Sequence, residues 1–158
     1  MPLAEDLLAQ AFLLVNKEPK KPKDASLRRA VSTAYYALFH LLIQEACAKW
    51  SHGPGREYLA RSFDHRIMKE ACTAAENASH PNAPPQVVGK LKSVARAFRE
   101  LQQARHLADY SYATHWDRVK ALAKISQAQT AFSDWKAIRS QDLAQRYLAT
   151  LLSRYNEW

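Results

Sequence analysis

The sequence predicts an all-α protein, folded as an antiparallel bundle of five to six helices in a single domain that spans residues 1–158. Ala and Leu supply 27 and 18 residues, whereas Val, Ile and Thr together supply 15. Straight-chain side chains favour helices and β-branched ones favour strands, so this composition argues against a sheet. Only three glycines occur, which leaves few places for sharp turns and predicts long helices. A chain of this length can enclose one substantial hydrophobic core.

Apolar residues recur every three or four positions along most of the chain, which is the spacing of a helix with one buried face. These stretches predict helices over residues 3–16, 24–50, 56–77, 87–110, 116–138 and 140–155. Prolines and glycines separate the stretches because neither residue continues a helix well. The third stretch is predicted as one helix or as two short ones, with a boundary near Asp64. Short connections between helices are typical of an antiparallel bundle.

Several helix starts can be predicted from residues that cap helices. Asp24 or Ser26 is expected to cap the second helix, since their side chains accept hydrogen bonds from free backbone N–H groups. Thr114 and Asp117 have the spacing of a capping box just before the fifth helix. Ser140 is expected to cap the last helix.

The chain is basic, with 23 Lys and Arg against 15 Asp and Glu and a formal net charge of +8. This balance favours polyanionic partners, because phosphates are attracted to cationic surfaces and release counterions on binding. The longest apolar run, residues 37–43, is far shorter than the roughly 20 residues that span a bilayer. The N-terminus also lacks the pattern of a secretory signal. We therefore expect a cytoplasmic protein that does not insert into membranes.

Most enzyme classes lack their minimum parts in this sequence. There is no glycine-rich phosphate loop, no nucleophile elbow and no carboxylate cluster at metal-binding spacing. Cys47 and Cys72 have no Cys or His partner at ligand spacing, so they suggest packed thiols. We expect neither a metal site nor a cofactor.

The second predicted helix carries a polar stripe beside its apolar seam. Ser32, Tyr36 and His40 follow one another at four-residue steps, and Arg28 or Arg29 lies one turn earlier. Residues four apart share one face of a helix, so these side chains can form a common surface. The alternative is structural: tyrosine rings and a hydrogen-bonded histidine at this spacing often pack into a core.

A second polar stripe lies in residues 99–112, which read RELQQARHLADYSY. Arg105 and Asp109 are four residues apart and can form an ion pair on the helix surface. Arg99 and His106 are seven residues apart and share a face, two turns from each other.

The segments RRAVSTAYYALFH and RHLADYSY, about 65 residues apart, together resemble the HEPN (higher eukaryotes and prokaryotes nucleotide-binding) superfamily. The resemblance covers roughly residues 24–138, although only these two segments are distinctive. It implies an all-α bundle that is commonly a homodimer. Many members of this superfamily are metal-independent ribonucleases of toxin–antitoxin and phage-defence systems, and others are noncatalytic partners of nucleotidyltransferases.

The catalytic members carry an Arg, usually followed by a polar residue, then a short spacer, a His and often a trailing Tyr. Carried onto this chain, Arg105 and His106 match the start of the motif and Tyr112 matches its end. Tyr110 stands where the catalytic His is expected. Because an unperturbed tyrosine, with a pKa of about 10, is a poor base near pH 7, this alignment predicts a phosphate-binding Arg105 without a proton shuttle.

Two other assignments remain open. Arg99 could hold the phosphate while His106 acts as acid and base. Alternatively, Arg105 could be joined by a histidine from elsewhere, such as His40 or His115. The corresponding functions are a HEPN-like RNA- or nucleotide-binding domain with degenerate catalysis, an active endoribonuclease, or a noncatalytic module that binds a partner protein. The residues expected to contact RNA are Arg28, Arg29, Tyr36, His40, Arg105, Asp109 and Tyr112.

Overall fold

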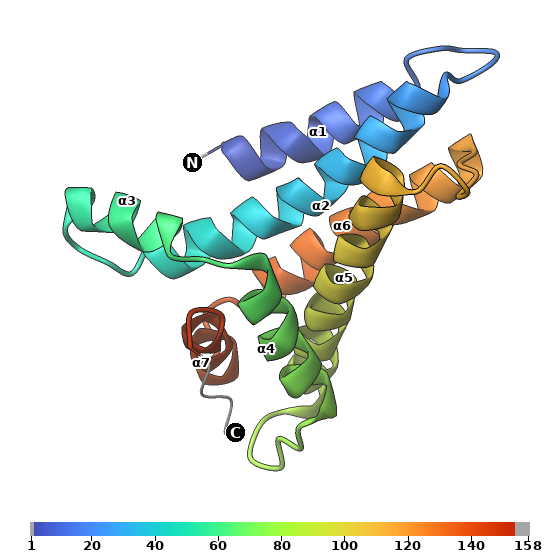
Figure 1. Ribbon diagram of the computed structural model, residues 1–158. Coiled ribbons are helices and arrows are strands. Elements are labelled where there is room, and N and C mark those ends of the chain that lie inside the picture. Colours follow the sequence, from blue (N-terminus) through green and yellow to red (C-terminus); the bar gives the residue numbers. More distant parts are fainter. Residues whose placement is uncertain (1, 154–158) are drawn as a thin grey trace.

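The computed structural model describes residues 2–153, which form helices joined by loops and contain no strand (Figure 1). The prediction of an all-α fold is confirmed for this part of the chain. Seven helices are described, more than the five to six predicted. They are α1 (Leu3–Val15), α2 (Asp24–Cys47), α3 (Gly53–Arg61), α4 (His65–Asn77), α5 (Pro85–Tyr110), α6 (Arg118–Ile138) and α7 (Asp142–Thr150).

The extra helix arises because the third predicted stretch is divided in two. Asp64 caps α4, and its carboxylate accepts hydrogen bonds from the backbone N–H groups of Arg66 and Ile67. The side chain of His52 accepts a hydrogen bond from the backbone N–H of Gly55 and caps α3 in the same way. The alternative of two short helices is therefore confirmed, with the boundary at Asp64.

The capping prediction for α2 is wrong. Lys23 occupies the cap position and makes no side-chain capping bond there, and the helix begins at Asp24. The Ser26 hydroxyl donates instead to the carboxylate of Glu18 at 2.9 Å. Ser26 is the third residue of α2 and therefore lies beyond the cap position.

The caps predicted for the last two helices are also displaced. Asp117 itself caps α6, and its carboxylate accepts from the Lys120 N–H at 2.7 Å, whereas Thr114 donates to Ser111 in the preceding turn. The last helix, α7, starts two residues after Ser140, without a side-chain cap. The end predicted for this helix, Tyr155, lies outside the described residues.

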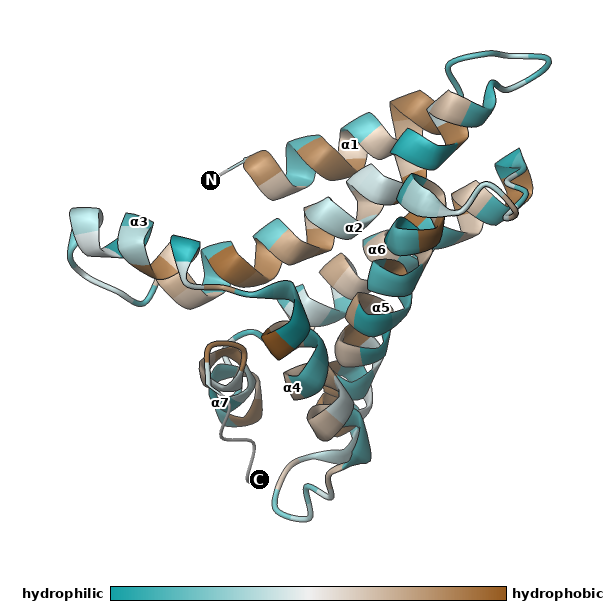
Figure 2. Cartoon of the chain, viewed as in Figure 1, coloured by the Kyte–Doolittle hydropathy of each residue, from teal (hydrophilic) through white to brown (hydrophobic). Residues whose placement is uncertain are grey.

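The buried hydrophobic side chains form one core cluster, to which every helix except α3 contributes buried residues. In Figure 1, α1 lies along α2, and α5 crosses α2 and continues past α4. Apolar and polar residues alternate along α2, while the loop between α1 and α2 is hydrophilic (Figure 2). The largest fully buried side chains include Trp135, Tyr35, Tyr147 and Phe98. Within residues 2–153, no helix has the length and apolar character needed to cross a membrane.

Two arginines complete the C-terminal ends of helices, where backbone carbonyls lack partners in the helix. The Arg28 guanidinium donates to the carbonyls of Leu107, Ala108, Ser111 and Thr114, all at or just after the end of α5. Arg118 donates in the same way to three carbonyls at and beyond the end of α1. No described residue adopts a positive φ, so the usual glycine cap is absent from these helix ends and arginine takes its place.

Candidate functional site

The two polar stripes predicted from the sequence meet where α5 crosses α2. The Arg105 guanidinium lies over the rings of Tyr35 and Tyr36, with its central carbon 5.4 and 5.9 Å from their centroids. Tyr35 is fully buried and Tyr36 is half-buried, so the second ring borders the surface. Such stacking stabilises a cation by its attraction to the negative face of an aromatic ring. We call the surrounding residues the Arg105 cluster: Ser32, Tyr35, Tyr36, Phe39, His40, His65, Arg105 and Asp109.

The donors of Arg105 are poorly satisfied by the protein. Its Nε is buried and has no hydrogen-bond partner among the described residues. The nearest carboxylate is that of Asp109, whose Oδ2 lies 3.9 Å from Nη1, and the Ser32 hydroxyl donates to the same oxygen at 3.4 Å. The Arg105 side chain is 16% exposed. Aromatic rings offset its charge but accept little from its N–H groups, so the guanidinium retains donors for an anion.

The sequence motifs did not identify His65, which completes this cluster. His65 is the first residue of α4, placed there by the Asp64 cap. Its Nδ1 lies 2.6 Å from the Tyr35 hydroxyl, and its ring stacks on Phe39 with the centroids 4.3 Å apart. The only sequence feature near His65 was the predicted helix boundary at Asp64, which carried no indication of a functional residue.

Burial lowers the pKa of His65, and the positive charge of Arg105 lowers it further, while Asp64 opposes both effects. The imidazole is therefore neutral near pH 7. Burial also raises the pKa of Tyr35, so its phenol keeps its proton. Because this hydroxyl has no other partner within residues 2–153, we assign it as the donor to His65 Nδ1.

This assignment leaves the proton of His65 on Nε2. In this state the imidazole presents an N–H donor to its surroundings, and its lone pair at Nδ1 is occupied by Tyr35. A permanent cation from Arg105 and a neutral donor from His65 suit the binding of an oxyanion better than the removal of a proton.

The predicted stripe residue His40 lies at the edge of the same cluster. Its ring meets Phe39 edge-on at 5.3 Å, and burial lowers its pKa. Tyr36 lies nearer the centre, with its ring centroid 6.1 Å from that of His65. The structure thus places Arg105, Asp109 and Tyr36 in one cluster, with His40 at its edge against Phe39.

The alternative pair of Arg99 and His106 is not gathered into one site. Arg99 donates twice to the carboxylate of Glu76, at 2.8 and 3.2 Å. His106 is exposed, and its ring lies against Tyr110 with the centroids 5.2 Å apart. The charge of Arg99 is therefore already compensated by a partner on α4.

The remaining predicted RNA contacts lie outside the cluster. Arg28 is held by carbonyl groups, as described above, and its side chain is 18% exposed. Arg29 is exposed and forms no ion pair among the described residues, and Tyr112 is fully exposed. His115 lines surface pockets formed with Trp116, not the cluster.

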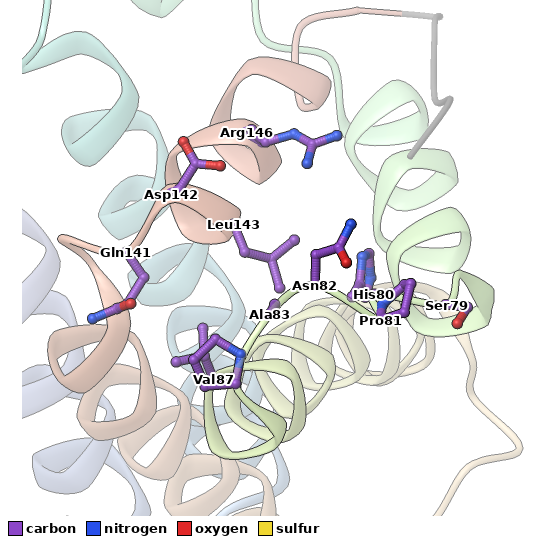
Figure 3. Close-up of a pocket in the computed structure, with 11 residues that line it drawn as sticks. Ser79, His80, Pro81, Asn82, Ala83, Val87, Gln141, Asp142, Leu143 and Arg146 are labelled. Atoms are coloured by element: carbon purple, nitrogen blue, oxygen red, sulfur yellow. The ribbon is translucent and has the colours of Figure 1, made fainter.

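A separate pocket of about 370 Å³ lies between the loop that follows α4 and the start of α7 (Figure 3). The loop contributes His80 and Asn82, and α7 contributes Asp142, Leu143 and Arg146. None of the residues that line this pocket belongs to the Arg105 cluster. Across residues 2–153, no group of three or more His, Cys, Asp and Glu side chains is arranged to hold a metal ion.

The Arg105 cluster therefore unites one half-buried tyrosine ring at the surface, a cation with unused donors and a neutral histidine. Its members come from α2, α4 and α5, which are distant in sequence. Comparison of the chain with protein-family models, with curated proteins and with solved structures gave no match.

Proposed function

We propose that this chain is a HEPN-like domain that binds RNA or a nucleotide through a phosphate held by Arg105, with catalysis weak or absent. The observation that carries the proposal is the guanidinium of Arg105, which lies over two tyrosine rings, is partly exposed and donates no hydrogen bond to any described residue. An arginine kept only for stability would be expected to satisfy its donors within the protein. The planar guanidinium matches the geometry of phosphate oxygens.

The neighbours of Arg105 are compatible with an incoming phosphate. The Asp109 carboxylate is 3.9 Å away, a weak ion pair that an oxyanion can replace. His65 adds an N–H donor without adding a second charge. The net charge of +8 favours the approach of a polyanion.

Equilibrium binding to a short fluorescein-labelled single-stranded RNA, followed by anisotropy at low salt, tests this proposal. Arg105→Met keeps an apolar side chain over the tyrosines and removes the charge, and it should weaken binding by about 10- to 100-fold. Arg146→Met, on α7 and outside the cluster, is the matched control and should bind like the parent. Absence of RNA binding by the parent, or equal affinity of both variants, would overturn the proposal.

An active metal-independent endoribonuclease is the second candidate, and the proximity of His65 to Arg105 favours it. His65 could supply the proton transfer that Tyr110 cannot. For His65 to act as a base at Nε2, its proton would have to move to Nδ1, where the Tyr35 hydroxyl now donates. Tyr35→Phe removes that competing donor and should therefore increase cleavage by such an enzyme.

The test of this second candidate is cleavage of labelled RNA in the presence of EDTA. A ribonuclease of this kind should lose activity in His65→Gln and keep it in His106→Gln, whose histidine lies on the exposed face of α5. No cleavage by either the parent or Tyr35→Phe would eliminate the enzyme and leave the binding domain.

The resemblance also implies a homodimer that acts in a defence or toxin–antitoxin system, or a complex with a nucleotidyltransferase. Sedimentation velocity of the purified chain, alone and with RNA, would test the dimer. If a partner protein rather than RNA covers the cluster, the parent should fail to bind RNA in the anisotropy assay.

A further inference from the structure

A second pocket, of about 300 Å³, lies between α5, the segment before α6 and the first turns of α6. We call it the lysine pocket. Its floor includes Ala104, Leu107 and Trp116, and its polar rim includes His115, Lys120 and Lys124. Ala104 and Leu107 face a different side of α5 from Arg105, and no member of the Arg105 cluster lines this pocket.

The lysine pocket is lined by two lysines, Lys120 and Lys124, that have no ion-pair partner among the described residues. Lys120 and Lys124 are one helical turn apart on α6, where like charges repel each other. Neither lysine forms an ion pair within residues 2–153; their ammonium groups make only long contacts of 3.4 and 3.5 Å with neutral oxygens. Two more charged residues line the pocket. Arg99 is paired with Glu76, and the Glu100 carboxylate accepts a hydrogen bond from the neutral Gln127 at 2.7 Å and keeps its negative charge.

Trp116, which lines the pocket, carries an unused hydrogen-bond donor. Trp116 is 7% exposed, and its indole N–H is buried without a hydrogen-bond partner among the described residues. Buried indole N–H groups usually donate to an acceptor. The rest of the floor is apolar, because Ala104 and Leu107 present only carbon atoms there.

We propose that the lysine pocket binds a small organic anion, in which a carboxylate or phosphate is attached to a flat apolar group. The anionic group would lie between Lys120 and Lys124 and relieve their repulsion. The flat group would cover Trp116 and the apolar floor. Ligand pockets commonly combine such an apolar lining with a few polar groups that fix orientation, and this one has a volume at the lower end of their range. This site is independent of phosphate binding at Arg105.

The experiment uses the full chain, labelled with ¹⁵N, and phenyl phosphate as the probe. The indole N–H resonance of Trp116, assigned by its loss in Trp116→Phe, should shift on titration. Inorganic phosphate lacks the flat group and phenol lacks the charge, so each should bind at least about 10-fold more weakly than phenyl phosphate. If either component alone binds as tightly as phenyl phosphate, the proposed ligand class is wrong.

Two lysine variants locate the anionic group. Lys124→Gln should weaken the binding of phenyl phosphate by about 3- to 10-fold, since it removes one charge-assisted contact. Lys136→Gln, an exposed position on the same helix and outside the pocket, should leave the affinity unchanged. The proposal is overturned if the Trp116 resonance does not move or if both variants bind as the parent does.

Discussion

Replacing Arg28 with Met tests whether this arginine serves the fold or a ligand. Its guanidinium donates to four carbonyls around the end of α5, at 2.8 to 3.3 Å, and its Nε pairs with Asp24 at 2.6 Å. Leu107 keeps a second donor in the variant, because its carbonyl also accepts from the Ser111 N–H. The carbonyls of Ala108, Ser111 and Thr114 would lose the donor that Arg28 provides.

The size of the effect follows from these three carbonyls. An acceptor left without its partner costs about 1 kcal/mol when water can reach it partly, which gives about 2–3 kcal/mol for Arg28→Met. The pair with Asp24 adds little, since an exposed ion pair of this kind contributes less than about 1 kcal/mol. For a chain of 158 residues, the melting temperature should fall by about 5–10 °C.

Urea denaturation followed by circular dichroism would measure the free energy of unfolding. Arg29→Met changes the next residue, whose side chain is exposed, and should alter stability by less than about 0.5 kcal/mol. If Arg28→Met is as stable as Arg29→Met, the carbonyl contacts do not stabilise the fold and Arg28 becomes available again as a phosphate ligand.

Three further perturbations probe contacts in and around the cluster. Arg105→Met should raise the pKa of His65, because the Arg105 charge, after burial, lowers this pKa in the folded protein. If the imidazole titration measured by NMR is unchanged, the charge of Arg105 does not act on His65. Arg99 holds the pKa of Glu76 below its ordinary value of 4.5, so the stability that Glu76 contributes is present above that pH and is lost as the pH falls through the folded-state pKa. The stability difference between the parent and Glu76→Gln should therefore be largest at about pH 6 and shrink as the pH falls below 4.5, and a difference independent of pH would refute this. Tyr35→Phe should lower the free energy of unfolding by about 1 kcal/mol, because it removes the hydrogen bond between the buried hydroxyl and His65. Tyr36→Phe removes no such bond and should lower it clearly less.

The helices could be predicted from local pattern, but most of the residues that cap them could not. Apolar spacing fixes which residues can share a buried face, and this information is contained within each segment. A cap depends on competition with the rest of the fold. Ser26 turns to Glu18 instead of capping α2, and Asp117 displaces Thr114 at the start of α6. The end of α5 also depends on a distant residue. Its free carbonyls accept hydrogen bonds from Arg28 of α2, and no glycine caps the helix.

The candidate site could be predicted only in part for a similar reason. Arg105 and Tyr36 are marked by their own segments, and the structure brings them together. His65 carries no motif. The Asp64 cap places it at the start of α4, and its ring contacts Tyr35, which is 30 residues away. Arg28 and Arg99 appear equally suited to phosphate in the sequence. In the structure, backbone carbonyls at the end of α5 bind Arg28, and the carboxylate of Glu76 binds Arg99. These partners come from distant parts of the chain.

The salt dependence of RNA binding tests the role of Arg105 most directly. Each phosphate of a single strand that a protein neutralises adds about 0.7 to the slope of log affinity against log salt concentration. If Arg105 holds one phosphate, Arg105→Met should bind more weakly and with a slope shallower by about 0.7 than the parent. Superimposable lines for the two proteins would show that the guanidinium over Tyr35 and Tyr36 does not contact the nucleic acid.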